Sequence, residues 1–230
     1  MSQSAFFESP VAQIIVGHGL NQRTFHVHTH LLEQHSEYFK VSLNSAFPEG
    51  QTKQVTLHED NADAFHLFVQ WIYSGDYNVK EARGVEYRST EDTYSCHAEA
   101  YTLGNKLIAP AFKIHTVKRL LKVLETFDGL SMTTLLDMVQ TVYAGTSEED
   151  GYDMRLALAH YCVSRIGKGR PIPGVSGFYA NEIDELAQTN NTSFLRDVLL
   201  LIPPGPRFSA RDLEVQLYVD QVWNNRAPGG

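Results

Sequence analysis

The first third of the chain mixes short apolar runs typical of β-strands with helix signals. Residues 13–16 (QIIV) form a β-branched run that ends at Gly17, and residues 24–28 (TFHVH) alternate apolar with polar side chains. Because successive strand residues point to opposite faces of a sheet, these two runs predict a hairpin. A third short strand is expected at residues 54–57, after a polar turn. Three strands of this length predict a small sheet and are too short to close a barrel.

After residue 60 the apolar period lengthens to three or four residues, which indicates helices. Asp60 or Asn61 provides an N-cap for the first of them, and Gly75 ends it. The polar segment 77–93 has no clear period and predicts a surface loop or a partly ordered insertion. The predicted inward stripes are Phe65, Phe68, Val69 and Ile72 in the first helix, Ala100, Leu103 and Leu107 in the next, and Val117, Leu120, Leu121 and Leu124 in a helix that begins with Pro110.

Residues 125–230 continue the helical pattern. A helix capped by Ser131 is expected, then an acidic connector at 145–151 and a helix at 152–166. A Gly- and Pro-rich loop at 167–177 precedes three further predicted helices. These lie at residues 182–186, 195–202 and 209–223, and the last carries an apolar stripe of Val215, Tyr218, Val219 and Val222. We expect this region to pack on the helices before it.

Composition excludes several classes of protein. The chain has 230 residues, 43% of them hydrophobic and 20% charged, which is typical of a globular protein. Its formal net charge is −8 with scattered basic residues, so nucleic acid is not an expected partner. No apolar run is long enough to span a bilayer and no signal peptide is recognised, so no membrane association is expected. Cys96 and Cys162 are predicted to be buried thiols without a disulfide, which favours a cytoplasmic or nuclear location.

The sequence gives no sign of catalysis or of a cofactor. It contains no G-x-S-x-G elbow, no Gly-rich phosphate loop with Lys and Ser/Thr, and no H-E-x-x-H motif. Four histidines do cluster, at His26, His28, His30 and His35. The first three would share one face only if a strand ran through all of them, so a metal site and a role in the fold are both open. We expect no enzyme, no cofactor, no metal and no small-molecule substrate.

Several ordered blocks resemble the BTB/POZ domain family, in the form common in filamentous fungi. The blocks are SPVAQIIVG, FHVHTHLLEQHSEYF, VTLHEDNADAFHLFVQWIYSGDY and AEAYTLGNKL, and they cover roughly residues 9–124. The resemblance implies an α+β fold, with a small three-stranded sheet flanked by helices. It divides the chain into a BTB/POZ domain at 9–124 and an all-helical C-terminal extension at 125–230. Two blocks of the extension, Val142 to Thr146 and Met154 to Leu156, also resemble the tails of such chains.

The resemblance implies a structural role for one histidine. The family's histidine falls on His28, where a strand gives way to a helix that begins near His30. A side chain at this junction can bond backbone groups that the two elements leave unpaired. We therefore expect His28 to be mostly buried, with at least one hydrogen bond, and we expect the strand not to continue into a metal site.

The resemblance also implies protein–protein recognition. Many members link a cullin scaffold to a substrate through a hydrophobic-x-Glu signature, and Phe47-Pro48-Glu49 stands at its expected place. Phe47 and Glu49 are thus predicted partner-binding residues, with Tyr73 as a weaker candidate. The alternative is a turn in which Phe47 is buried in the protein's own core. The chain is predicted to be an adaptor, such as a substrate-recruiting subunit of a cullin-type ubiquitin ligase; the rival prediction is a self-associating scaffold or regulator without cullin binding. In either case the extension could also hold a substrate or widen the scaffold groove.

Overall fold

The computed structural model describes residues 9–46, 48–83, 90–126, 130–149, 151–166 and 191–201. Strands β1 (Val11–Val16), β2 (Arg23–His28) and β3 (Gln54–Leu57) form a three-stranded sheet in the order β2-β1-β3. β1 pairs antiparallel with β2 and parallel with β3. Alternate residues of the central strand β1, beginning with Ala12, are fully buried. The predicted hairpin and third strand are therefore confirmed, and the sheet is mixed.

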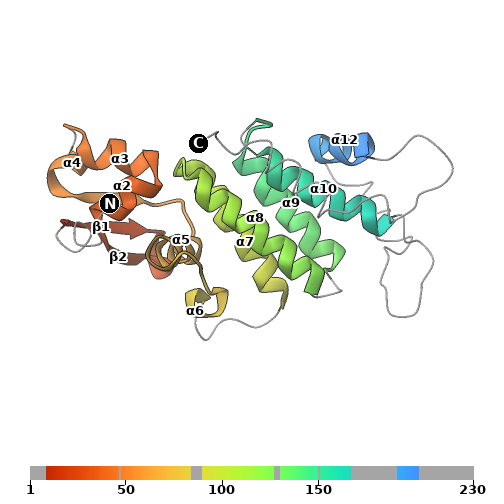
Figure 1. The fold of residues 1–230 in the computed structure, drawn as a ribbon, viewed down its shortest axis with the longest axis horizontal. Coiled ribbons are helices and arrows are strands. Elements are labelled where there is room, and N and C mark those ends of the chain that lie inside the picture. The colour runs from red at the N-terminus through yellow and green to blue at the C-terminus, as the bar shows by residue number, and fades with distance from the viewer. Residues whose placement is uncertain are drawn as a thin grey trace, which may run out of the picture.

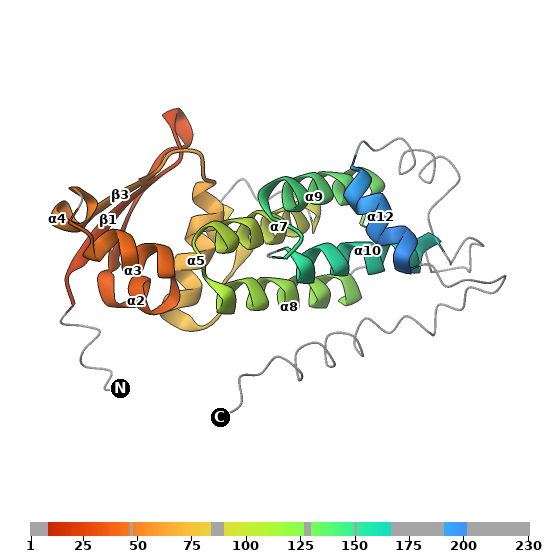
Figure 2. The same cartoon turned by 90° about the horizontal axis from the view of Figure 1, so that it is seen from above.

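Helices make up most of the remaining described chain. Figures 1 and 2 show the sheet with its covering helices at one end, α7 and α8 in the middle, and α9, α10 and α12 at the other end. The helices are α2 (Thr29–His35), α3 (Glu37–Asn44), α4 (Pro48–Thr52), α5 (Ala62–Ser74), α6 (Val79–Arg83), α7 (Thr90–Lys106), α8 (Pro110–Thr126), α9 (Met132–Gly145), α10 (Tyr152–Ile166) and α12 (Thr192–Leu201).

The helices largely follow the predicted periods, with two corrections and some predictions left open. The polar turn expected before β3 is wrong, because it contains the short helix α4. The segment 77–93, predicted as a surface loop or a partly ordered insertion, contains α6 and the first turn of α7, so the loop alternative is wrong. The predicted cap of α5 is confirmed: Asn61 Oδ1 accepts from the N–H groups of Asp63 and Ala64, at 2.7 and 3.2 Å. Gly75 ends α5 with a φ of 81°, which favours glycine. The loop predicted at 167–177 and the helices at 182–186 and 209–223 lie outside the described residues.

Two hydrophobic cores fill the molecule, and α7 and α8 contribute to both. Leu103 of α7 and Phe112 of α8 pack with the sheet and with α5 in the first core. Tyr101 of α7 and Leu120 of α8 pack with α9, α10 and α12 in the second. The extension therefore packs on the preceding helices, as expected. The boundary at 124/125 stays a prediction, because α8 runs through it.

Ser36 fixes the turn between α7 and α8 against α3. Its buried Oγ accepts from Phe39 N at 3.2 Å, which caps α3, and donates to the Leu107 carbonyl at 2.6 Å. Tyr38 N donates to the same carbonyl at 3.3 Å. Backbone donors at the first turn of a helix need acceptors, and here the α7–α8 turn supplies some of them. One serine thus joins a local helix cap to a long-range contact.

Arg155 performs a similar task in the extension. Its buried guanidinium donates to the carbonyls of Tyr143 and Thr146 at the end of α9, and its Nε lies 3.1 Å from Thr146 Oγ1. The last carbonyls of a helix lack partners within the helix, so a buried arginine there satisfies several at once. Gly151 lies so close that a Cβ would be 2.1 Å from Thr146 Oγ1. The two sequence blocks that resemble family tails are thereby in direct contact.

A chain that ends at Glu125 is predicted to lose solubility and to melt earlier than the full chain. Tyr94, Tyr101 and Leu120 are buried under the extension, so its removal exposes apolar surface on α7 and α8. Differential scanning calorimetry and size-exclusion chromatography would measure the melting temperature and the aggregation state. A shortened chain that stays monomeric and melts no earlier would contradict the two-core arrangement.

Candidate protein-interaction surface

His28 and Tyr73 form a hydrogen-bonded pair where β2 meets α2. The Nδ1 atom of His28 lies 2.7 Å from Tyr73 Oη, and the backbone N–H of His28 donates to the same oxygen at 3.2 Å. The expected hydrogen bond of His28 is confirmed. His28 is partly buried, so the expectation that it is mostly buried is not contradicted. Tyr73, at 43% exposure, brings its hydroxyl to the junction.

The other histidines of the cluster point to separate environments. His26 is exposed on the edge strand β2, whereas His35 packs edge-on against Trp71, with ring centroids 5.0 Å apart. Burial, and secondly the neighbouring His30, lowers the pKa of His35 below its usual value. Within the residues that the structure describes, no group of three or more His, Cys, Asp or Glu could hold a metal ion.

Of the three predicted partner-binding residues, the structure describes Glu49 and Tyr73, and these two lie on different helices. Glu49 is exposed in the first turn of α4, a helix that packs on α3 and β3. Tyr73 lies on α5, which packs on α2, α6 and α7. Figures 1 and 2 both place α4 at the outer end of the molecule and α5 closer to α7. Phe47 lies outside the described residues. Partner binding by all three stays a prediction.

Two contacts hold α4 in place. Gly50 approaches the end of α3 so closely that a Cβ would be 2.0 Å from the Ser45 carbonyl oxygen. Lys53, with a left-handed φ of 54°, donates from Nζ to the Leu43 carbonyl. A helix of five residues is not stable alone, so these contacts fix its direction. They set the orientation in which Glu49 is presented.

Two exposed apolar residues on this side of the molecule were not predicted. Val41 on α3 is 62% exposed, and Ile108 in the α7–α8 turn is 57% exposed. The Ile108 carbonyl accepts from Glu37 N at 3.3 Å, which places this residue beside the first turn of α3. Helical periodicity could have found Val41, because Phe39 and Leu43 occupy the buried face of α3. Ile108 has a φ of 49°. A β-branched residue rarely adopts this left-handed conformation, so there was no reason to expect it from the sequence.

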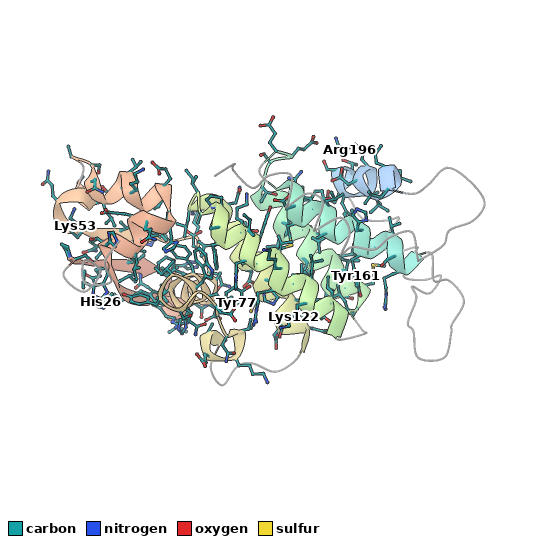
Figure 3. All side chains as sticks on the ribbon, viewed as in Figure 1. His26, Lys53, Tyr77, Lys122, Tyr161 and Arg196 are labelled. Carbon is teal, nitrogen blue, oxygen red and sulfur yellow. The ribbon has the colours of Figure 1, made fainter. Side chains whose placement is uncertain are left out.

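A polar network joins the α5–α6 connection to the helices α7 and α8. Asp76 lies 2.9 Å from His115 Nε2 and 3.5 Å from Arg119 Nη1, and Arg119 Nη2 donates to the Tyr77 carbonyl at 3.2 Å. The Tyr77 hydroxyl lies 2.7 Å from Nδ1 of the buried His97. Figure 3 shows Tyr77 close to these helices, well away from Lys53 at the outer end. Sequence reasoning missed this network, because its members are distant in the chain.

Burial dominates the electrostatics of this network. It raises the pKa of Tyr77 far above the usual value, and it lowers the pKa of His97 to about 3, with Arg119 and His115 acting in the same direction. Burial opposes ionisation of Asp76 as well. The pKa of Asp76 is nevertheless lowered, because the Tyr77 N–H, His115 and Arg119 favour the carboxylate. The network therefore keeps His97 neutral and Asp76 charged at neutral pH.

Comparison with known protein families identifies the first part of the chain. Residues 12–109 match the BTB/POZ domain model. This segment is a BTB/POZ domain. No curated protein matches the chain. In the part of the chain that the structure describes, no helix is long and apolar enough to cross a membrane. The BTB domain is a protein-interaction module, so the relevant question is which of its surfaces remain accessible.

The described helices of the extension, α9, α10 and α12, lie away from the α3–α4 end of the BTB domain. Figures 1 and 2 show α9, α10 and α12 beyond α7 and α8, on the side away from the sheet. Val41 and Glu49 are exposed at the accessible end. The extension instead covers faces of α7 and α8 that contribute to the second core. Helices α9, α10 and α12 therefore do not cover α3 and α4.

Removal of the Tyr73 hydroxyl is predicted to destabilise the BTB domain by about 1 kcal/mol. The reason is that the backbone N–H and the ring Nδ1 of His28 each lose a hydrogen-bond partner. Tyr73→Phe and His28→Ala should be non-additive in a double-mutant cycle measured by urea denaturation. Tyr38→Phe, a tyrosine change elsewhere in the domain, serves as the control. If the effects of the two changes on the free energy of unfolding are fully additive, the hydrogen bond between His28 and Tyr73 does not contribute to stability.

Acid is predicted to destabilise the protein through His97. In the unfolded chain this histidine takes up a proton near its ordinary pKa of 6.5, whereas the folded value is about 3. The unfolded state thus binds more protons between these values, and stability falls as pH falls through this window, by at most about 1.4 kcal/mol per pH unit for one group. Denaturation at pH 7.5, 6 and 5 should show a shallower pH dependence for His97→Gln than for wild type. His26→Gln, at an exposed histidine, is the control and should leave the pH dependence of stability unaltered. If His97→Gln also leaves it unaltered, His97 is not the cause of the loss of stability in acid.

Proposed function

We propose that this protein is a non-catalytic adaptor whose BTB domain binds a cullin-type scaffold through its α3–α4 end. The main support for the proposal is that Val41 on α3 and Glu49 on α4 are both exposed. An accessible apolar side chain with a carboxylate nearby suits a partner that offers an apolar pocket and a basic group. The second element of the adaptor is the helical extension, which faces the opposite end.

The local chain supports this assignment of the surface. Pro48 begins α4, and Gly50 and Lys53 hold the helix against the end of α3. A pre-ordered segment loses little conformational entropy on binding, which favours affinity. Phe47 immediately precedes this segment, so an exposed Phe47 would supply the aromatic anchor. Tyr73 belongs to another face and acts, in this proposal, on the fold more than on the scaffold.

A reducing compartment, cytoplasmic or nuclear, suits such an adaptor. Cys96 and Cys162 are buried and form no disulfide. Burial raises the pKa of the Cys162 thiol to about 12, so it stays protonated and unreactive at neutral pH. Thiols of this kind act as small apolar side chains in the core. They need no oxidising environment.

The second candidate function is a self-associating scaffold that does not bind a cullin. It is favoured by the exposure of Val41 and Ile108 on the same side of the BTB domain, because apolar residues near one another also suit contact with a second copy. Light scattering coupled to size-exclusion chromatography separates the two candidates. A monomer, in which the α3–α4 end stays accessible, fits the first candidate. A stable dimer that buries Val41 fits the second.

The double change Phe47→Ala with Glu49→Ala is predicted to weaken binding to a cullin N-terminal domain by about 2 kcal/mol or more, with little change in melting temperature. Val41→Asp should weaken it as well, because a charge is placed at an apolar contact. Isothermal titration calorimetry measures the affinity. Leu20→Asp, at a fully exposed leucine between β1 and β2, is the matched control and should bind normally.

Two outcomes would contradict the adaptor mechanism. If the wild-type protein does not bind the cullin domain, or if the folded double variant binds as tightly as wild type, the self-associating scaffold becomes the better account. A large loss of stability in the double variant would instead indicate that Phe47 is buried in the protein's own core, since loss of a buried phenylalanine costs about 3–5 kcal/mol.

A further inference from the structure

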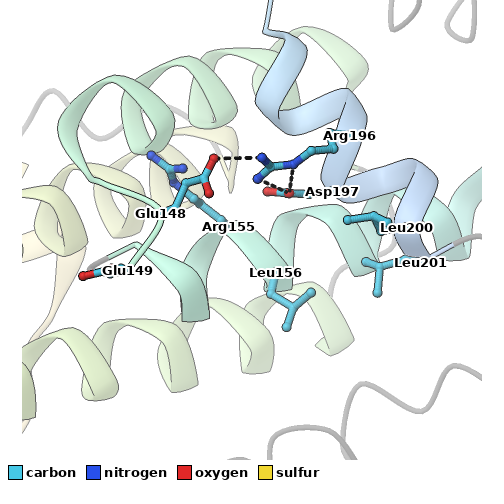
Figure 4. Close-up of a pocket in the computed structure, with 8 residues that line it drawn as sticks. All are labelled: Glu148, Glu149, Arg155, Leu156, Arg196, Asp197, Leu200 and Leu201. Atoms are coloured by element: carbon cyan, nitrogen blue, oxygen red, sulfur yellow. Dashed lines mark hydrogen bonds and ion pairs between the residues drawn. The ribbon is translucent and has the colours of Figure 1, made fainter.

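A pocket opens between α10 and α12 at the end of the extension. Its volume is about 580 Å³, and Figure 4 shows ion pairs on one side of it and leucines on the other. Arg196 bridges Glu148 at 2.9 Å and Asp197 at 3.2 Å. The apolar side consists of Leu156, Leu200 and Leu201. The pocket therefore suits a group with an apolar body and a polar tip.

The outer face of α12 beside this pocket is uncovered within the described chain. Leu199 is 67% exposed and Leu200 is 77% exposed, although Phe194 and Val198 of the same helix are buried. Leu199 and Leu200 are consecutive, and Leu200 also lines the pocket. Single exposed leucines need no explanation, but Leu199 and Leu200 are adjacent and lie beside the apolar side of the pocket, so together they offer an apolar surface to a partner.

The chain itself continues from this surface. Leu201 lines the pocket and ends α12, and residues 202–230 follow it. Seven residues, 202–208, separate it from residue 209 and can span up to about 23 Å. The sequence predicts a helix at 209–223 with the apolar stripe of Val215, Tyr218, Val219 and Val222. A helix of this length is marginal in water unless its apolar face packs on another surface.

We propose that the C-terminal segment 209–223 docks on α12 and places Tyr218 in the pocket between α10 and α12. A tyrosine ring packs against leucines while its hydroxyl reaches a polar group, which matches the two sides of this pocket. The valines of the stripe cover Leu199 and Leu200. The segment and α12 then form an αα-hairpin connected by the Pro-rich linker.

The covalent link favours this occupant over a second copy or a foreign protein. A short linker gives the tethered segment an effective concentration in the millimolar range, far above that of a separate protein at micromolar concentration. The linker also starts at the pocket, so little chain is needed to reach it. Docking covers the exposed leucines of α12 and the stripe of the segment at the same time. This inference is independent of the proposed scaffold contact, because it concerns the opposite end of the molecule.

Hydrogen exchange on the full chain, read by mass spectrometry, tests the proposal. Backbone amides at 209–223 should be protected in the wild-type monomer, and protection should not depend on protein concentration. Tyr218→Asp should reduce that protection by at least about tenfold. Gln216→Asp adds the same charge two residues away, off the stripe, and should have little effect.

A reciprocal change on α12 makes the test specific to this pocket. Leu200→Asp alters a side chain that belongs to neither hydrophobic core, so the helices of the extension should stay folded by circular dichroism while protection at 209–223 falls by a similar factor. Leu20→Asp is the control for an added charge elsewhere. Unprotected amides at 209–223 in wild type, protection that survives Leu200→Asp, or protection that appears only with dimerisation would each overturn the proposal.

Discussion

The structure depends on two helices that each contribute to both hydrophobic cores. α7 gives one face to the BTB core and the opposite face to the helices of the extension, whereas α8 contributes Phe112 near its start to the BTB core and residues further along, such as Leu120, to the extension. An amphipathic helix usually buries one stripe and leaves the other in water. Tyr101 of α7 breaks this rule, because it lies on the second stripe and is fully buried. The extension is for this reason part of the folded unit, and residues deep in the second core stabilise the helices that support the first.

Much of the fold could be predicted from local patterns in the sequence. Strand alternation located β1, β2 and β3, and the cap at Asn61 with Gly75 delimited α5 to within a residue. Local patterns failed where tertiary contacts decide the structure. The five-residue α4 was expected as a turn, and it forms because Gly50 and Lys53 anchor it to α3. Ile108 is exposed in a left-handed turn whose preceding carbonyl, that of Leu107, bonds the distant Ser36.

The candidate site was predictable only in part, because it too depends on packing between elements that are distant in sequence. Glu49 was expected on an accessible loop, and its exposure agrees with that expectation. Tyr73 was expected at the same surface, but its hydroxyl is engaged by His28 on another face. Which side chains converge is decided by packing between elements distant in sequence, and one sequence has no signal for it. The network around Tyr77 and Arg155's contacts with α9 illustrate the same limit, since each combines several unremarkable residues into one polar cluster.

The parallel pairing of β1 with β3 has a consequence for how the accessible end forms. Parallel neighbours need a crossover connection, and here that connection runs from β2 through α2, α3 and α4 before β3 joins the sheet. Gln13 of β1 pairs with Gln54 of β3, so this pairing closes a long loop that contains the three helices, and such long-range pairings slow folding. Val41 and Glu49 sit inside this obligatory loop. Substitutions that impair the packing of α3 or α4 would slow closure of the sheet itself, so the surface offered to partners is also a segment on which the folding rate of the domain depends.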